Sequence, residues 1–141
     1  MLERLRQVAF LVKDLEEGKE LYRRHLGMET CHSEDLTNYG LLNAVLPAGA
    51  GTFIELLQPT SEESAAARYL ERRGEAPYML IFETSEYDRL IPNLKSMGVR
   101  LSEEPVTDDY RHAFIHPSSA NGAFLEIIEV TSSENPWPSA G

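Results

Sequence analysis

A chain of 141 residues, of which 42% are hydrophobic, is long enough for one compact domain with a substantial apolar core, or for two small halves that share one. A net charge of -10 argues against nucleic acid and anionic membranes as partners. The single cysteine, Cys31, excludes an intrachain disulfide. The charged first residues and the lack of a long apolar run give no sign of a signal sequence or a membrane span, so we expect a cytoplasmic protein.

The chain opens with the pattern of a strand followed by a helix. The apolar run QVAFLV at 7–12 is typical of a buried strand. Asp14, with Glu17 three residues later, has the spacing of a capping box and predicts a helix start. Gly27 predicts the end of that helix, because glycine readily adopts the left-handed conformation found there.

Three more strands and a central helix follow. Two strands are expected within 28–45, and TFIELLQ at 52–58 is typical of a further buried strand. Thr60 and Glu63 have the spacing of a second capping box, so we expect a helix over 61–73.

After the central helix the pattern restarts. An apolar strand is expected at 78–84, and then a helix that Ser85 caps and Gly98 ends. Pro92 lies inside this helix and should kink it or shorten it by a turn. The remaining expected strands are 100–105, 110–116 and 123–130. The polar residues 131–141 predict a flexible tail.

The two halves of the chain repeat one another. QVAF, which begins at Gln7, matches MLIF, which begins at Met79, and FIELLQ matches FLEIIE. Gln7 and Glu55 are 48 positions apart, and Met79 and Glu126 are 47 apart. Such self-similarity indicates duplicated structural units that pack together.

The repeat places one glutamate in the last strand of each half. Glu55 and Glu126 lie in strands too apolar to be fully exposed, and a carboxylate there is costly unless it is paired, protonated or bound to a cation. Hydrogen bonds to neighbouring polar groups are the alternative explanation. Because the two positions match, we favour a functional role, and we expect both glutamates to converge with Gln7 and Met79 about a pseudo-two-fold axis.

The chain resembles the vicinal oxygen chelate superfamily, which includes glyoxalase I, extradiol dioxygenases and bleomycin-resistance proteins. The methylmalonyl-CoA epimerase branch looks closest, on the segments VAFLVKDL, ELLQPTSEESAAARYLERRGE and FIHPSSANGAFLEIIE. The resemblance implies an α+β fold in which two βαβββ modules form a cupped mixed sheet with helices on the outer face. It implies one domain over 1–130, with modules 5–58 and 78–130 linked by the helix at 61–73.

The resemblance also implies a metal site at Gln7, Glu55, Met79 and Glu126. Met79 departs from the family pattern, which has histidine there, and a thioether is a soft ligand that does not match two carboxylates. The oxygen donors of Gln7, Glu55 and Glu126 could hold one divalent metal (Mn, Co, Ni, Zn or Mg) weakly, or none. Gln7 and Met79 would then contact the substrate. His32 or His112 would be a substitute ligand if its strand turned it towards the site.

Two functions of different class remain open. The first is an isomerase or lyase that acts on a small carbonyl compound or an acyl-CoA, with Glu55 and Glu126 as the catalytic acid and base. The second is a metal-free protein that binds a small molecule for drug sequestration or sensing, with Met79 as adaptable packing. The resemblance implies a small-molecule partner and a homodimer in either case.

Overall fold

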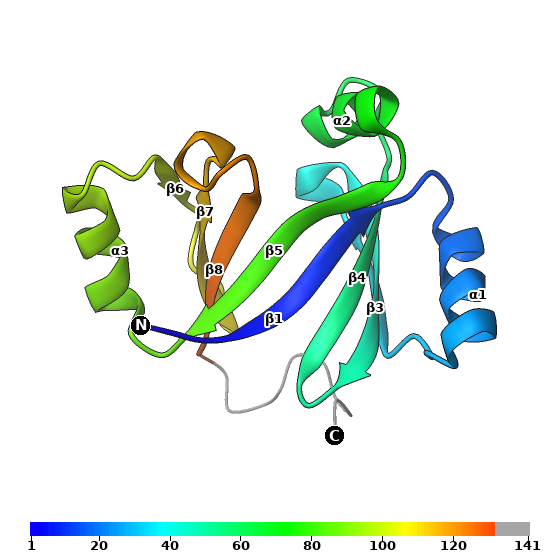
Figure 1. Ribbon diagram of the computed structural model, residues 1–141, viewed down its shortest axis with the longest axis horizontal. Coiled ribbons are helices and arrows are strands. Elements are labelled where there is room, and N and C mark those ends of the chain that lie inside the picture. Colours follow the sequence, from blue (N-terminus) through cyan, green and yellow to red (C-terminus); the bar gives the residue numbers. More distant parts are fainter. Residues whose placement is uncertain (132–141) are drawn as a thin grey trace. The chain divides into compact units, whose positions relative to one another are not determined.

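The structure is a computed structural model and describes residues 1–131. Within that range, eight strands form a mixed sheet in the order β2-β3-β4-β1-β5-β8-β7-β6, together with three α-helices (Figure 1). The strands are β1 (Leu2–Leu11), β2 (His32–Leu36), β3 (Leu41–Gly49), β4 (Thr52–Pro59), β5 (Ala76–Thr84), β6 (Leu101–Glu103), β7 (Tyr110–Ile115) and β8 (Phe124–Val130). The helices are α1 (Leu15–Leu26), α2 (Ala65–Arg73) and α3 (Tyr87–Ser96). Each half of the chain therefore runs strand, helix and three strands, which confirms the predicted α+β fold.

The chain divides into two compact units, which we call the α1 unit and the α3 unit after their helices. The α1 unit comprises 8–78, and the α3 unit comprises 1–7 together with 79–131. The order of elements follows the predicted repeat of 5–58 and 78–130, but the first residues of β1 pack with the second half of the chain.

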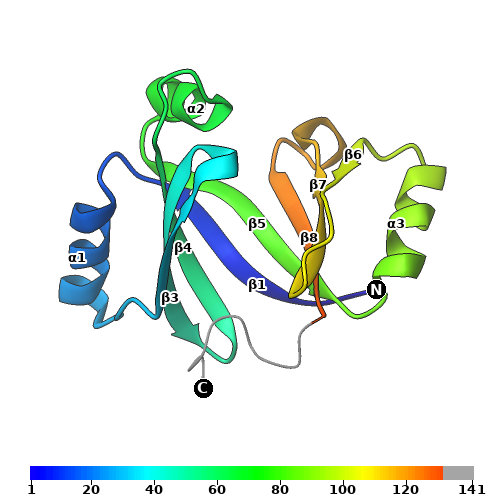
Figure 2. The same cartoon turned by 180° about the vertical axis from the view of Figure 1, so that it is seen from behind.

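In the α1 unit, helix α1 packs along the strands β3 and β4 (Figure 2). Asp14 is the N-cap and accepts a hydrogen bond from Glu17 N at 2.9 Å, and Gly27 ends the helix at a φ of 66°. Both residues have the roles that the sequence predicts. The apolar core on this face joins Leu15 of the helix to strand residues that include Ala44, Leu46 and Leu56.

Helix α2 begins later than the sequence predicts. The pattern predicts a helix over 61–73 with Thr60 as its cap, but α2 starts at Ala65, and Ser64 accepts the hydrogen bond from Ala67 N at 3.0 Å. Several hydroxyl side chains precede the alanine run, and the last of them, on Ser64, is the cap.

In the α3 unit, helix α3 packs on strands β7 and β8, and its core residues are Tyr87, Leu90, Ile91, Ala113, Ile115 and Ile127. Ser85 is not the cap that the sequence predicts. The N-cap is Glu86, whose backbone N–H donates to Thr84 Oγ1 at 3.0 Å. The helix continues past Pro92 to Ser96, so this proline does not end it.

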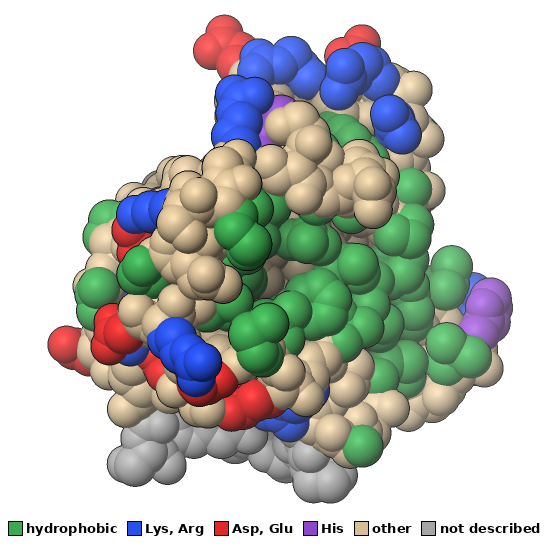
Figure 3. Space-filling view, turned by 60° about the vertical axis from the view of Figure 1, so that its left-hand side comes forward, with side chains coloured by type: hydrophobic (Ala, Val, Ile, Leu, Met, Phe, Trp, Pro, Cys, Tyr) green, Lys and Arg blue, Asp and Glu red, His purple; other side chains and the backbone are tan. Residues whose placement is uncertain are grey.

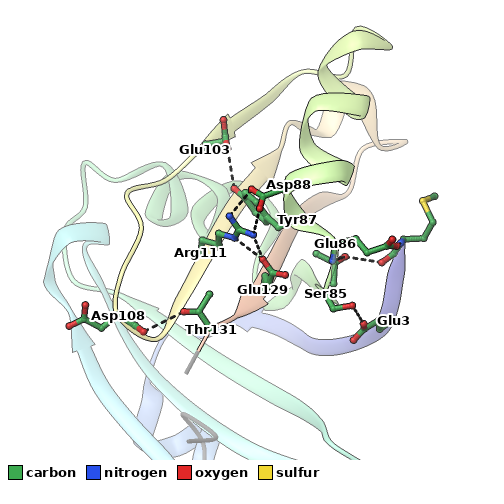
Figure 4. Close-up of polar contacts among 12 residues, drawn as sticks. Glu3, Ser85, Glu86, Tyr87, Asp88, Glu103, Asp108, Arg111, Glu129 and Thr131 are labelled. Atoms are coloured by element: carbon green, nitrogen blue, oxygen red, sulfur yellow. Dashed lines mark hydrogen bonds and ion pairs between the residues drawn. The ribbon is translucent and has the colours of Figure 1, made fainter. Parts of the chain in front are cut away.

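One arginine of β7 ties α3 to the sheet (Figure 4). Arg111 donates to Asp88 Oδ1 at 2.7 Å and to Glu129 Oε2 at 2.6 Å, and its guanidinium lies 4.8 Å from the ring centroid of Tyr87. Burial, together with the nearby Glu103, raises the pKa of Tyr87 to about 12. The cluster fixes the first turn of α3 against β7 and β8.

A buried arginine joins the first residues of β1 to β5 in the same unit. Arg6 is only 2% exposed, and both it and Arg4 donate to Glu83 Oε2 at 2.8 Å. Burial lowers the pKa of Arg6 and opposes ionisation of Glu83, but the two arginines prevail and hold the pKa of Glu83 below its usual value. This shared carboxylate adds a charge-assisted side-chain link to the backbone hydrogen bonds between the two strands.

The end of the described chain is anchored. The sequence predicts that Thr131 opens a flexible tail, but its N–H donates to Asp109 O at 2.8 Å (Figure 4 shows its side chain beside Asp108). The rest of the predicted tail, 132–141, lies outside the described residues. No helix among the described residues is long and apolar enough to cross a membrane.

Candidate active site

The first predicted glutamate lies in the middle of β4 in the α1 unit. Glu55 is 7% exposed and accepts a hydrogen bond from Asn43 Nδ2 at 3.0 Å, with Asn43 on the neighbouring strand β3. The amide oxygen of Asn43 accepts from Glu34 N at 2.9 Å. Because both ends of the amide are engaged, its orientation is fixed, and it presents a neutral donor to the carboxylate.

The second predicted glutamate lies in the middle of β8 in the α3 unit. Glu126 is 9% exposed, and its Oε1 lies 2.7 Å from Nδ1 of His112 on the neighbouring strand β7. His112 is itself only 4% exposed. At this distance the two side chains share a hydrogen bond, which is charge-assisted when the carboxyl is ionised.

The two pairs occupy equivalent places in the repeat. In the antiparallel register, Val45 is opposite Glu55, and Phe114 is opposite Glu126. Asn43 lies two residues before Val45, and His112 lies two residues before Phe114. Each is therefore a diagonal neighbour of its glutamate on the same face of the sheet. The repeat thus has the same carboxylate twice, with an amide partner in one unit and an imidazole partner in the other.

Both pairs lie on the sheet face that points away from the helix of their unit. Alternate residues of the same strands, Ala44 and Leu56 in one unit and Ala113 and Ile127 in the other, pack in the cores under α1 and α3. Side chains alternate along a strand, so the glutamates and their partners must face the opposite way. In each unit the carboxylate therefore lies on the side of the strands opposite α1 or α3.

Met79 shares the face of Glu126 in the α3 unit. In the parallel pairing of β5 with β8, Ile81 is opposite Glu126 and Met79 is opposite Phe124. Met79 is 9% exposed, and Gln7, which belongs to the same unit, is 2% exposed. The expected convergence of these residues with Glu55 stays a prediction, since Glu55 belongs to the α1 unit.

Aromatic rings surround the His112–Glu126 pair on its own face. Tyr110 and Phe114 lie edge-on to the imidazole with ring centroids 5.0 and 5.4 Å away, and Phe124 stacks on Phe114 at 5.4 Å. This apolar border limits the water around the pair and strengthens its electrostatic interactions.

The predicted metal ligands do not suit a tightly bound metal ion. Within residues 1–131, no three histidine, cysteine, aspartate or glutamate side chains gather as a group that could hold one. Of the predicted ligands, Met79 offers a soft thioether, and one oxygen of Glu126 is engaged by His112. His32, the other candidate substitute ligand, lies 3.4 Å from Glu34 of its own strand. We therefore assign no step of the reaction to a metal ion.

The sequence points to both glutamates but not to what holds them. Asn43 does not stand out in β3, and His112 is predicted only as a substitute ligand. A signal is present nonetheless, because the segment NAVL that begins at Asn43 matches HAFI, which begins at His112. When the repeat is extended to these segments, the two residues fall at equivalent positions.

With this fold and these paired carboxylates, the chain belongs to the Glyoxalase/Bleomycin resistance protein/Dioxygenase superfamily, whose family model matches residues 4–127. Several of its relatives are acyl-CoA epimerases. It is 31% identical over 135 residues to an ethylmalonyl-CoA/methylmalonyl-CoA epimerase of Cereibacter sphaeroides, and the match covers 92% of this chain and all of the relative.

Solved structures agree with this comparison. The methylmalonyl-CoA epimerase of Mycobacterium tuberculosis is 33% identical, with a TM-score of 0.85, and the match covers 93% of this chain and 90% of that one. A variant of the Streptomyces coelicolor epimerase, solved with 2-nitronate-propionyl-CoA, is 27% identical, with a TM-score of 0.87 over 96% of this chain and all of that one.

Proposed function

We propose that this chain is an isomerase of the acyl-CoA epimerase kind, which removes and returns the proton on the carbon next to a thioester carbonyl. The observation that carries the proposal is the pair of buried glutamates, one in each unit, at equivalent positions of the repeat, each on the side of its strands opposite α1 or α3. The names of its relatives support the same class of substrate.

The proposed reaction needs one group that accepts a proton and one that returns it. The C–H bond next to the carbonyl breaks, its proton moves to a protein base, and its electron pair is delocalised onto the thioester oxygen as an enolate. Return of a proton to the other side of the carbon gives the epimer, with no net oxidation or reduction. Glu55 and Glu126 are the groups that we propose for these roles, and Gln7 and Met79 are proposed to contact the substrate.

The charge distribution of the α1 unit also suits a coenzyme A ester, which carries phosphate groups. Although the chain is acidic as a whole, basic side chains gather over α2, at the top of the view in Figure 3. The helix itself carries Arg68, Arg72 and Arg73. Arginine recognises phosphate well because its planar group donates two parallel hydrogen bonds. On the family resemblance we also expect a homodimer.

The test is epimerisation of (2R)-methylmalonyl-CoA, followed by chiral separation of the product. We expect turnover by the wild type and a loss of about 100-fold or more in Glu55→Gln, since a positioned acid or base contributes that much. Glu16→Gln is the matched control, because Glu16 is an exposed helix residue paired with Lys19. Tight binding of the ester without turnover would contradict the proposal and favour a metal-free binding protein.

A further inference from the structure

We propose that His112, rather than Glu126 itself, exchanges the proton with the substrate in the α3 unit, and that Glu126 is the residue that positions it. This inference rests on the proposed function and refines it, because the proton-transfer role given there to Glu126 passes to His112. It is carried by the geometry of the pair, by the free nitrogen of the imidazole and by the contrast with the α1 unit.

The hydrogen bond fixes which ring nitrogen is free. Nδ1 lies 2.7 Å from Glu126 Oε1, and an ionised carboxylate can only accept, so the proton of a neutral imidazole resides on Nδ1. Nε2 then carries the lone pair. A carboxylate that holds an imidazole by Nδ1–H in this way leaves Nε2 as the basic atom.

The second ring nitrogen is unoccupied and not completely sealed from solvent. Among residues 1–131, the His112 side chain makes a single hydrogen bond, from Nδ1 to Glu126. Its other ring nitrogen, Nε2, has no hydrogen-bond partner among these residues. Nε2 is not among the fully buried polar atoms without a partner in the same residues, so it is not completely sealed from solvent although His112 as a whole is buried. An imidazole nitrogen in this state can accept a proton.

The α1 unit shows that holding a glutamate does not require a histidine. Asn43 occupies the equivalent place and supports Glu55 with a neutral amide hydrogen bond of 3.0 Å. If Glu126 needed only a donor, an amide would serve there as well. The imidazole adds the ability to carry a proton, which is the property that the proposed reaction uses.

The proposed step balances without any further reagent. The proton leaves the carbon next to the thioester and binds to Nε2 of His112, and the electron pair of the C–H bond becomes the enolate. The resulting imidazolium keeps its Nδ1–H on Glu126, whose negative charge stabilises it. Glu55 remains the proposed proton-transfer group of the α1 unit.

The experiment measures deuterium uptake into methylmalonyl-CoA from deuterium oxide by the full chain. His112→Asn converts the pair into the kind found at Asn43 and Glu55, and we expect it to lower the exchange rate about 100-fold or more. In His112→Ala, imidazole added to the buffer should restore part of the rate. The control is His116→Asn, because His116 caps a turn by accepting from Ser118 N and lies outside the pair. It should leave the rate unchanged.

A second measurement does not depend on activity. The imidazole nitrogen chemical shifts of the wild type, assigned by comparison with His112→Asn, should show the proton of His112 on Nδ1. Glu126→Gln should change the ratio of the two imidazole tautomers, with the proton on Nδ1 or on Nε2. A proton found on Nε2 instead would overturn the inference. So would a His112→Asn variant that keeps the wild-type exchange rate. Absence of exchange by the folded wild type would instead overturn the proposed function itself.

Discussion

At the scale of single residues, the site depends on how each buried carboxylate is supported. A buried polar group is stable only when its hydrogen bonds are made, and each glutamate of the repeat takes a donor from the neighbouring strand. Asn43 makes a second hydrogen bond as well, because its amide oxygen accepts from the backbone N–H of Glu34. This makes Asn43 a structural residue of β2, β3 and β4 as well as a support for Glu55.

The role of Asn43 predicts a stability defect. Asn43→Ala removes the donor to Glu55 and the acceptor of Glu34 N, and we expect the free energy of unfolding to fall by about 1–3 kcal/mol. Urea unfolding followed by circular dichroism measures it. Asn93→Ala, an exposed position on α3, is the matched control and should change stability by less than about 0.5 kcal/mol. Equal effects in the two variants would contradict the structural role.

At the scale of elements, a shared carboxylate holds the start of β1 on β5. Arg6 is almost fully buried, and its guanidinium is paired with the carboxylate of Glu83 at 2.8 Å. Removing one partner of a buried ion pair is far more damaging than removing an exposed one. The stability of the α3 unit should therefore depend on Glu83 and on its ionisation.

We expect Glu83→Gln to lower the free energy of unfolding by about 3 kcal/mol at neutral pH. The pKa of Glu83 is lowered in the folded state, so its contribution is present above the unfolded value of about 4.3 and is lost as pH falls through the folded value. The difference between wild type and variant should thus shrink in acid. Urea unfolding at several pH values tests this, with Glu16→Gln as the control; a constant difference would refute it.

The order of elements is predictable from the sequence because it follows from local patterns. Helix caps depend on only a few neighbouring residues. In the structure Asp14 begins α1 and Gly27 ends it, as the sequence predicts. The predicted start of α2 is too early, because Thr60 and Ser64 are both suitable caps and only the folded backbone selects between them. Local signals therefore give the elements, but they fix an end only where a single suitable cap is present.

The candidate site is predictable only in part, for a different physical reason. Glu55 and Glu126 stand out because a carboxylate in an apolar strand is unusual on its own. Their partners depend on strand register, which the length and geometry of each hairpin decide. His112 and Asn43 lie 14 and 12 positions before their glutamates, so no constant spacing points to both.

At the scale of the whole molecule, the fold is that of a metal-using superfamily, but the residues at the metal-ligand positions differ from the family pattern. Met79 supplies a thioether, and His112 engages Glu126, so the chain offers no strong ligand group within its described residues. We therefore assign proton transfer to side chains alone.

This assignment predicts that metal removal has no effect. Dialysis against a chelator should leave the exchange rate of the wild type unchanged, because no proposed step uses a metal. Elemental analysis before and after dialysis checks that removal is complete. A rate that falls with the chelator and returns with Mn²⁺ or Co²⁺ would show that a metal takes part in the reaction and would contradict this assignment.

The most direct test of the proposed catalysis is deuterium exchange by the wild type, measured by mass spectrometry. The chain is incubated with methylmalonyl-CoA in deuterium oxide, beside a sample without protein that gives the uncatalysed rate. We expect uptake of one deuterium on the carbon next to the thioester, far faster than in the sample without protein. Uptake no faster than in that sample, by folded protein that binds the ester, would contradict catalysis and leave a ligand-binding protein.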